Sequence, residues 1–497
     1  MQAARHLRPW TIPILLCLVA FGLRLGPLWA NRFHSDEALY ATWALGIASG
    51  RDVLLSSAMP DKPPLLFYTL AAAFLALGRT EAAARLAGLW AGVVSVALVW
   101  AARPDRSVKP VTSDVAAAAM ALSPFAISFS PTAFLDPLMV MLALASLVAA
   151  MHRRPGWAGV LLGLAVATKV QALVFLPLVI ATAFYGRSSR LGASAVKLGV
   201  GLAIPVGAVL VWDRLRGGTP FWIQQAINYG GVRLVYASEV MPRLVSWTSF
   251  LPHFFGWPMF IVLAVGLPLL LVYDLTRGAC TGTATLDLIL IAFVAGYFFL
   301  HWLLAFPVWD RYLLGLVPVM CLLIGRLASP DHWSGLALLA RRFGAGRVIA
   351  RGSDLAPVII VIVLLAFPAV QAWQSTIPVG GDHGPHDGID RVAAFLRDRP
   401  SGTVVYDHWL GWVLRYYLWD ANVYIAYFAT PETLAQDLGA FGRTSPRYIV
   451  FPANESTVRV ERAIAAESFV LSPVLLTKDR HDQPTFTLYR IDAHVNR

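Results

Sequence analysis

The sequence contains a succession of long apolar runs separated by short basic segments, and this succession limits the possible folds more than any other feature. An α-helix needs about 20 predominantly apolar residues to cross the hydrocarbon core of a bilayer. The succession therefore predicts an α-helical polytopic membrane protein with about 11–13 transmembrane helices. The runs cover approximately residues 10–30, 84–102, 111–129, 134–151, 156–168, 170–186, 192–212, 250–273, 285–305, 311–328 and 355–373.

Composition narrows the class further. Only 14% of the residues are charged and 57% are hydrophobic, whereas a soluble domain carries about 25% charged residues. A soluble globular protein and a disordered chain are therefore excluded. The net charge of +11 lies in short clusters between the apolar runs, which indicates lipid headgroups rather than nucleic acid as partners. The three cysteines, Cys17, Cys280 and Cys321, lack the spacing of a disulfide framework or a zinc site.

The segment 64–78 decides the predicted orientation. Its 15 residues make a helix of about 22 Å, shorter than a hydrocarbon core of about 30 Å. If the segment spans the bilayer, the basic loops face outward, against the positive-inside rule. We therefore predict an interfacial or re-entrant segment, a cytoplasmic N-terminus and a multi-pass protein of the cytoplasmic membrane. The loops then assigned to the cytoplasm contain Arg103, Arg106, Lys109, Arg153, Arg154, Arg187, Arg190, Lys197, Arg277 and the arginines of residues 326–351.

Two regions follow from this orientation. Residues 1–373 form a transmembrane domain with long external loops at 31–83 and 213–249. Residues 374–497 form a small extracytoplasmic domain, in which helical patterns alternate with strand-like runs. This alternation is typical of an α/β fold. The helical patterns are 389–397 and 431–441, and the strand-like runs are 402–406, 447–451 and 485–491.

Two pairs of ionisable residues stand in the first external loop. Asp36 and Glu37 follow the first apolar run, and Asp61 and Lys62 precede the segment 64–78. Charged groups near membrane depth are costly, so those on the external side are functional candidates. Neighbouring carboxylates cannot share one helix face, so one acid is expected to act and the other to anchor. Taken singly, each pair has a structural alternative: a helix start for the two acids, and a solvated turn for Asp61 and Lys62.

These pairs belong to a longer series of motifs within residues 10–330. The series comprises Asp36-Glu37-x-x-Tyr40-Ala41, Asp61-Lys62-Pro63-Pro64-Leu65, Gly78-x-x-Glu81-x-x-x-Arg85-Leu86, Ser130 to Asp136, Thr168-Lys169 and Arg311-Tyr312-Leu313-Leu314. In the order and spacing of these motifs the chain resembles the GT-C integral-membrane glycosyltransferases of the protein mannosyltransferase and lipid A aminoarabinose transferase type.

The resemblance implies sugar transfer from a polyprenyl-monophosphate-linked donor to a lipid, glycan or protein acceptor at the outer membrane face. Inversion is expected if attack and departure occur on opposite faces of the anomeric carbon. It implies that Asp36 acts as base or orients the acceptor, and that Glu37 and Asp61 serve as structural acids or hold a divalent metal cation. The residues implied to line the site are Lys62, Arg311 and Tyr312 around the donor phosphate, Asp136 as a second-loop acid and Tyr40 beside the substrate.

The residues themselves add further candidates. Lys169 and Arg233 can join the phosphate site at headgroup depth, although snorkelling alone also explains Lys169. Trp222, Gln225 and Tyr229 lie at helical spacing in the second loop and suit a sugar. An interfacial aromatic belt is the alternative for these three residues.

Histidines are given structural roles. His34 and His301 have no second histidine at helical spacing, so we do not predict that they bind metal. The sequence Asp382-His383-Gly384-Pro385-His386-Asp387 contains metal-ligand residue types, but its glycine-rich surroundings favour a solvated hinge.

Two other functions stay open. A lipid-linked oligosaccharide ligase or polymerase also works at external loops, but with a pyrophosphate donor. A transporter or flippase is the non-enzymatic alternative, for which inverted repeats are expected. No such repeat is visible in the sequence, and the acids gather in external loops.

Overall fold

The computed structural model describes residues 2–103, 110–185, 191–276, 282–329 and 356–494. The chain divides into two compact units, a membrane unit of residues 1–30 and 46–380 and a C-terminal unit of residues 31–45 and 381–497. The segment that carries Asp36 and Glu37 thus belongs to the same unit as the C-terminal domain. Several residues of the predicted cytoplasmic loops lie outside the described residues, as does one cysteine: Arg106, Lys109, Arg187, Arg190, Arg277, Cys280 and the arginines of 330–351.

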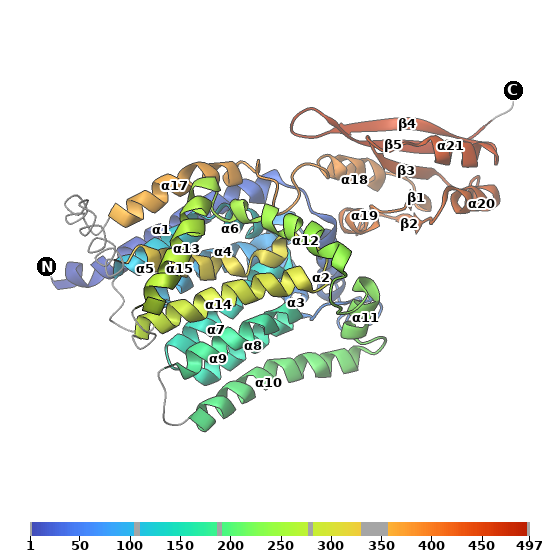
Figure 1. Ribbon diagram of the computed structural model, residues 1–497. Helices are drawn as coiled ribbons and strands as arrows, with labels where there is room; N and C mark the ends of the chain where they lie inside the picture. Colours follow the sequence, from blue (N-terminus) through green and yellow to red (C-terminus); the bar gives the residue numbers. More distant parts are fainter. Residues whose placement is uncertain (1, 104–109, 186–190, 277–281, 330–355, 495–497) are drawn as a thin grey trace. The chain divides into compact units, whose positions relative to one another are not determined.

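The described part of the membrane unit consists of helices joined by loops, with one isolated β-bridge between Leu234 and Leu304 (Figure 1). Helix α2, Ser35–Ala48, begins in the C-terminal unit and ends in the membrane unit. The other helices are α1 Gln2–Ala30, α3 Leu65–Leu77, α4 Glu81–Ala101, α5 Pro110–Leu122, α6 Pro124–Phe129, α7 Leu135–Met151, α8 Pro155–Thr168, η1 Val170–Phe175, α9 Leu176–Phe184, α10 Leu191–Arg216, α11 Phe221–Tyr229, α12 Ala237–Ser249, η2 Leu251–Phe254, α13 Trp257–Thr276, α14 Gly282–Leu303, η3 Asp310–Leu313, α15 Leu316–Leu327 and α17 Ala356–Trp373.

Within the described residues, six helices are long and apolar enough to cross a membrane, and six more apolar helices are shorter. The predicted polytopic helical fold is therefore confirmed. The long apolar segments are Trp10–Ala30, Glu81–Ala101, Leu191–Arg216, Trp257–Thr276, Ala284–Leu303 and Ala356–Trp373.

Some predicted runs are interrupted. The run 111–129 is divided at Ser123, whose side chain accepts a hydrogen bond from the Ala126 N–H and so caps α6. The run 170–186 starts as the 3-10 turn η1 before α9 begins at Leu176. Apolar periodicity alone does not reveal such breaks, because the residues on both sides of each break are apolar.

Helices α8 and α10 meet at glycines. A Cβ atom on Gly159 would lie 2.1 Å from the carbonyl oxygen of Leu198, and one on Gly201 would lie 2.4 Å from that of Gly156. Small residues let helix backbones approach closely where lipid supplies no hydrophobic driving force. This close packing holds the N-terminal part of α8 against α10.

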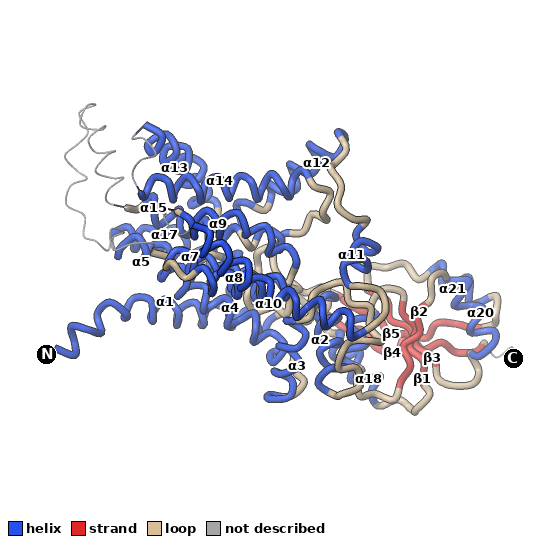
Figure 2. The backbone as a smooth tube through the Cα atoms, turned by 90° about the horizontal axis from the view of Figure 1, so that it is seen from below, coloured by secondary structure: helices blue, strands red, loops and turns tan. Residues whose placement is uncertain are grey.

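The C-terminal unit contains a five-stranded sheet in the order β2-β1-β3-β5-β4. Strand β1 pairs in parallel with β2 and β3, and β5 pairs antiparallel with β3 and β4. Figure 2 shows all of these strands gathered in one sheet. The predicted α/β domain is therefore confirmed. The elements are α18 Ile389–Arg397, β1 Thr403–Asp407, α19 Gly411–Tyr417, β2 Val423–Tyr427, α20 Pro431–Phe441, β3 Arg447–Pro452, α21 Val458–Ala465, β4 Phe469–Lys478 and β5 Pro484–Ala493.

The predicted solvated hinge at residues 382–387 is wrong. Asp382, His386 and Asp387 are only 3%, 6% and 8% exposed. The Asp382 carboxylate accepts hydrogen bonds from the backbone N–H groups of Gly384 and His386, and Asp387 pairs with the guanidinium of Arg480. These bonds satisfy the polar groups locally, so that the segment is folded into the unit despite its glycines.

Candidate active site

The predicted pair of Asp61 and Lys62 lies buried in the membrane unit. The ammonium of Lys62 lies 2.5 Å from Asp61 Oδ2, and both residues are 5% exposed. Helix α11, in the second loop predicted to be external, contacts this pair. Its Asn228 side chain donates to Asp61 Oδ2 at 3.1 Å, and Lys62 donates to the Tyr229 hydroxyl at 3.1 Å while lying 4.6 Å from the centre of that ring. The two loops predicted to be external, 31–83 and 213–249, therefore meet at Asp61 and Lys62.

A second buried pair joins Asp136 to Lys169. Asp136 lies in the first turn of α7, and Lys169 stands between the end of α8 and the start of η1, outside both helices. The Lys169 ammonium donates to Asp136 Oδ1 at 2.6 Å and lies 4.2 Å from the centre of the Tyr312 ring. Lys169 is 7% exposed, which disfavours simple snorkelling to water.

Aromatic rings connect the two pairs and surround Arg311. The Arg311 guanidinium lies 4.4 Å from the centre of a Trp309 ring and 4.8 Å from that of Phe134. Trp309 packs in turn against Tyr229 at 5.8 Å and Tyr312 at 5.4 Å between ring centres. We call the combined set the cation–aromatic cluster: Asp61, Lys62, Phe134, Asp136, Lys169, Tyr229, Trp309, Arg311 and Tyr312.

The charges of the cluster are close enough to influence one another. Burial lowers the pKa of Lys169 to about 8; the negative charge of Asp136 opposes this shift, while the positive charges of Arg311 and Lys62 add to it. Burial also raises the pKa of Asp310, next to Arg311. Three cations thus share the cluster with the two carboxylates of Asp61 and Asp136, and an added anion would relieve their mutual repulsion.

Hydrogen bonds fix the backbone of Tyr312. The Tyr297 hydroxyl donates to the Tyr312 carbonyl oxygen at 2.6 Å, and the Gln171 side chain donates to the same carbonyl at 3.2 Å. Gln171 also donates to the Tyr297 hydroxyl at 2.9 Å. These bonds hold Tyr312 where its ring receives the Lys169 ammonium.

The Asp36–Glu37 pair opens helix α2 in the C-terminal unit. Glu37 is fully buried and accepts a hydrogen bond of 3.0 Å from the His34 N–H, so it anchors the start of its own helix. Asp36 is partly exposed, and its backbone N–H donates to His34 Nδ1 at 3.1 Å. The two carboxylates therefore have different surroundings, which suits one acting and one anchoring acid.

Most of the other residues predicted from the sequence lie outside the cation–aromatic cluster. Arg233 forms two hydrogen bonds of 2.8 Å with Glu239, outside the cluster, and these bonds lower the pKa of Glu239 to about 2. Trp222 is 46% exposed and packs edge-on against Phe221, and Gln225 is half-buried on the same helix. Of the three predicted residues on α11, Tyr229 is the one that joins the cluster. Tyr40 is buried against Trp43 in the C-terminal unit.

The surroundings of Asp61 do not fit a divalent cation. Its Oδ2 atom already accepts from Lys62 and Asn228, and an ammonium takes the place that a metal would need. Among the residues that the structure describes, no group of three or more His, Cys, Asp or Glu side chains could hold a metal. We therefore derive no chemical step through a metal.

Four residues of this arrangement were missed by sequence reasoning: Asn228, Trp309, Gln171 and Tyr297. Asn228 directly precedes Tyr229 and Trp309 lies two positions before Arg311, so a signal for them existed. Gln171 and Tyr297 are polar residues within apolar runs, and the cost of burying a polar group could have marked them.

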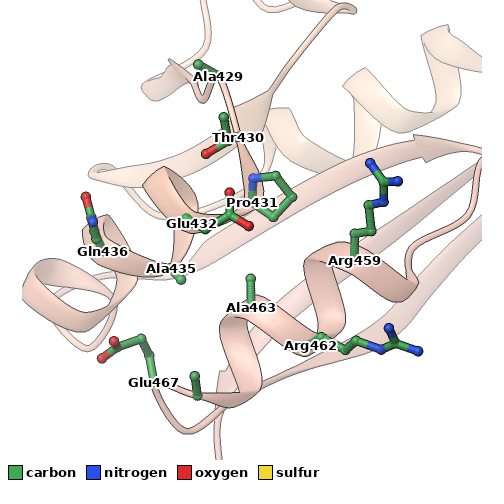
Figure 3. A pocket seen from close by; sticks show the side chains of 11 residues that line it. Ala429, Thr430, Pro431, Glu432, Ala435, Gln436, Arg459, Arg462, Ala463 and Glu467 are labelled. Carbon is green, nitrogen blue, oxygen red and sulfur yellow. The ribbon is translucent and has the colours of Figure 1, made fainter.

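A separate groove lies in the C-terminal unit between α20 and α21, with a volume of about 910 Å³. Figure 3 shows Glu432 on one side and Arg459 and Arg462 on α21, with alanines between them. The groove contains none of the residues predicted for the site.

One model of a known protein family matches part of the chain. Residues 61–212 match the family model of dolichyl-phosphate-mannose-protein mannosyltransferases, a stretch that contains Asp61, Lys62, Asp136 and Lys169. No curated protein sequence matches the chain.

Solved structures resemble the chain over almost its whole length. ArnT from Cupriavidus metallidurans bound to undecaprenyl phosphate is 14% identical, with 96% of this chain and 97% of that chain covered and a TM-score of 0.63. The same protein in the apo state is 15% identical over the same shares, with a TM-score of 0.68. The oligosaccharyltransferase of Archaeoglobus fulgidus in its apo form is 11% identical, with 94% and 70% covered and a TM-score of 0.53. These matches confirm the fold that the sequence resemblance implied.

Proposed function

We propose that this chain, which has the fold of the GT-C glycosyltransferases, transfers a sugar from a polyprenyl-monophosphate-linked donor to a lipid, glycan or protein acceptor. The observation that carries the proposal is the cation–aromatic cluster, in which Lys62, Lys169 and Arg311 are buried together. The ArnT structure with the same fold was solved with undecaprenyl phosphate bound, which supports a polyprenyl phosphate as the donor's lipid part.

The cluster suits a phosphate that becomes a leaving group. When the bond between the sugar and the phosphate breaks, negative charge develops on the phosphate oxygens, and preorganised cations stabilise that charge. Asp61 holds Lys62 and Asp136 holds Lys169 before any ligand arrives. The cations therefore need little reorganisation when the charge develops, which is the condition under which such stabilisation is largest.

The rings of Tyr229, Trp309 and Tyr312 complement these charges. They keep the ammonium and guanidinium groups in place through cation–π contacts and exclude water from their sides. A lower local dielectric strengthens every charge interaction in the site. Aromatic faces also suit the apolar faces of a sugar ring.

Asp36 is proposed as the base or acceptor-orienting carboxylate. It is the partly exposed acid of the first pair, whereas Glu37 is committed to the backbone of His34. In an inverting transfer one carboxylate takes the proton of the acceptor hydroxyl while the phosphate leaves from the opposite face of the sugar carbon. We place Asp136 in a supporting role, because its oxygen holds Lys169.

The reaction is proposed to occur at the outer face of the cytoplasmic membrane. Positive loops on the cytoplasmic side, a cytoplasmic N-terminus and an extracytoplasmic C-terminal unit are mutually consistent under the positive-inside rule. A donor with a lipid tail reaches such a site laterally, at the depth of the headgroups.

A lipid-linked oligosaccharide ligase or polymerase is the competing function, and the similarity to the archaeal oligosaccharyltransferase fold is the observation that keeps it open. Purified protein should be given polyprenyl-monophosphate and polyprenyl-pyrophosphate sugars in parallel, with products read by mass spectrometry. Transfer from the monophosphate alone supports the proposal. Transfer from the pyrophosphate alone favours the ligase, and movement of the lipid without any glycosidic product favours a flippase.

A further inference from the structure

Within the C-terminal unit, residues 381–497 contact the segment that leads into α2 at three places. Arg480 donates to the Asn31 side chain at 3.2 Å while it forms bonds of 2.9 and 3.0 Å with Asp387. The ring of Phe33, which is fully buried, packs edge-on against Tyr416 at 4.7 Å between ring centres. The start of α2 is therefore fixed by residues that follow it by more than 300 positions in the chain.

The third contact is between two histidine rings. His34 and His386 pack edge to face, with 6.5 Å between ring centres and an angle of 70° between the rings. Offset and edge-to-face rings at such distances attract one another. Three other contacts fix the ring of His386. Its Nδ1 lies 2.8 Å from Asp382 Oδ1, and the ring also packs near Trp409 and Phe486.

The hydrogen bonds determine where each ring carries its proton. His34 Nδ1 accepts from the Asp36 N–H, so the proton of His34 is on Nε2. A carboxylate only accepts hydrogen bonds, so His386 Nδ1 carries a proton and donates it in a hydrogen bond to Asp382. In a neutral ring, Nε2 of His386 then has a lone pair and can accept a hydrogen bond. The residues described by the structure offer no hydrogen-bond partner to this buried Nε2 atom. The two neighbouring histidines thus have complementary tautomers, one with a donor at Nε2 and the other with an acceptor.

His34 is the link to Asp36. Its N–H is held by Glu37 and its Nδ1 holds the Asp36 N–H, so the orientation of the imidazole and the conformation of the first turn of α2 depend on each other. A buried carboxylate that fixes a histidine tautomer is a recurrent way to set the geometry of a reacting group. Here that carboxylate belongs to Asp382, at the start of the C-terminal domain.

We propose that the Asp382–His386 pair is a positioning device: it fixes the His34 ring and, through it, the turn of α2 that carries Asp36. This inference rests on the proposed function insofar as Asp36 is the reacting carboxylate. It gives residues 381–497 a part in positioning the reacting carboxylate. None of the site residues predicted from the sequence lies in this part of the chain.

Two variants of the full-length protein separate the contributions of the histidine. His386→Asn keeps a side-chain donor for Asp382 but removes the Nε2 edge of the ring, and His386→Gln returns an amide near the position of Nε2. His408→Asn is the matched control, because among the described residues the His408 ring contacts Glu455, Trp409, Phe428 and Phe451 but neither His34, Asp382 nor His386. A displacement of a reacting group by about 1 Å costs roughly 100-fold in rate.

The kinetic readout is the transfer rate with a polyprenyl-phosphate sugar. We expect His386→Asn and Asp382→Asn to lower kcat by about 10- to 100-fold, with the donor KM unchanged, and His386→Gln to recover part of the loss. His408→Asn should keep the wild-type rate. Wild-type kcat in His386→Asn, or an equal loss in the control, would overturn the proposal.

A second readout does not depend on transfer. Nitrogen-15 NMR of histidine-labelled protein distinguishes the two neutral tautomers, and His34→Gln assigns the signal of His34. We expect His386→Asn to shift the His34 signals and His408→Asn to leave them in place. If the wild type transfers no sugar at all, the proposed function fails, and the NMR result alone tests the positioning role. Unchanged His34 signals in His386→Asn would then overturn that role, and shifted signals would support it.

Discussion

Lys169 donates a hydrogen bond of 2.6 Å to Asp136, a residue 33 positions earlier in the chain, and both side chains are buried. A buried ion pair gains little net stability, because desolvation offsets the Coulomb attraction. The presence of this pair directly after α8 is better explained by a task that needs a fixed positive charge. The pair of Asp61 and Lys62 repeats the same arrangement in the loop between α2 and α3. Both pairs lie within the stretch that matches the mannosyltransferase family model.

The charge of Lys169 should give the transfer reaction a measurable pH dependence. Its pKa in the free protein is lowered to about 8, so the ammonium is present below that pH and is lost as the pH rises through it. We expect kcat/KM for the donor to fall above about pH 8. In Lys169→Arg this limb should move to higher pH, because a guanidinium stays protonated. A limb that remains near pH 8 in this variant would show that another group titrates.

Lys62 and Arg311 should contribute to donor affinity rather than to folding alone. We expect Lys62→Gln and Arg311→Gln each to raise the donor KM at least about tenfold, since a hydrogen bond to a charged group contributes about 1.5–3 kcal/mol. The control is Arg459→Gln, which removes an exposed arginine from the groove on α21. Donor titration checks this prediction, and an equal effect of the control would point to a general charge effect.

Chelation tests the role of a divalent cation. Because the Asp61 carboxylate already accepts from Lys62 and Asn228, we expect the transfer rate to survive treatment with EDTA followed by removal of the chelator. If the rate is lost and then restored by added Mg²⁺, Mn²⁺ or Zn²⁺, a metal takes part, and the neighbours of Asp61 must rearrange to admit it.

The glycine contact between α8 and α10 gives a stability prediction. Gly201→Val places methyl groups against the backbone of α8, and we expect a loss of about 1–3 kcal/mol in the free energy of unfolding. Gly199→Val on the same helix is the control, because a Cβ there meets nothing within 4 Å. Thermal unfolding in the same detergent compares the two. Equal melting temperatures of the two variants would show that the close contact between α8 and α10 at Gly201 does not contribute to stability.

The sequence predicted the elements with strong periodicity and missed those that depend on tertiary contacts. The helix predicted at 389–397 coincides with α18, Ile389–Arg397, which has a regular apolar face. Strand β4 was missed because Pro473 interrupts its pattern. It lies at the edge of the sheet, where a proline is tolerated, and the register shifts directly after it.

The site could be predicted residue by residue but not as an arrangement. Asp136 and Lys169 were each candidates, yet nothing in their spacing showed that they pair, since the turn between α7 and α8 and the break before η1 bring them together. Arg233 shows the converse. It is a basic residue of the right loop, but Glu239, six positions later, takes its guanidinium. Local partners of this kind become visible only when the backbone conformation is known.

The central claim is that Asp36 acts as the base or acceptor-orienting carboxylate while the cation–aromatic cluster holds the donor phosphate. Its most direct test is the activity of purified Asp36→Asn with a polyprenyl-phosphate sugar, together with donor binding by the same sample. We predict that transfer is lost while the donor binds as in the wild type and the melting temperature stays the same. Wild-type transfer by Asp36→Asn would remove this carboxylate from the reaction and contradict the claim.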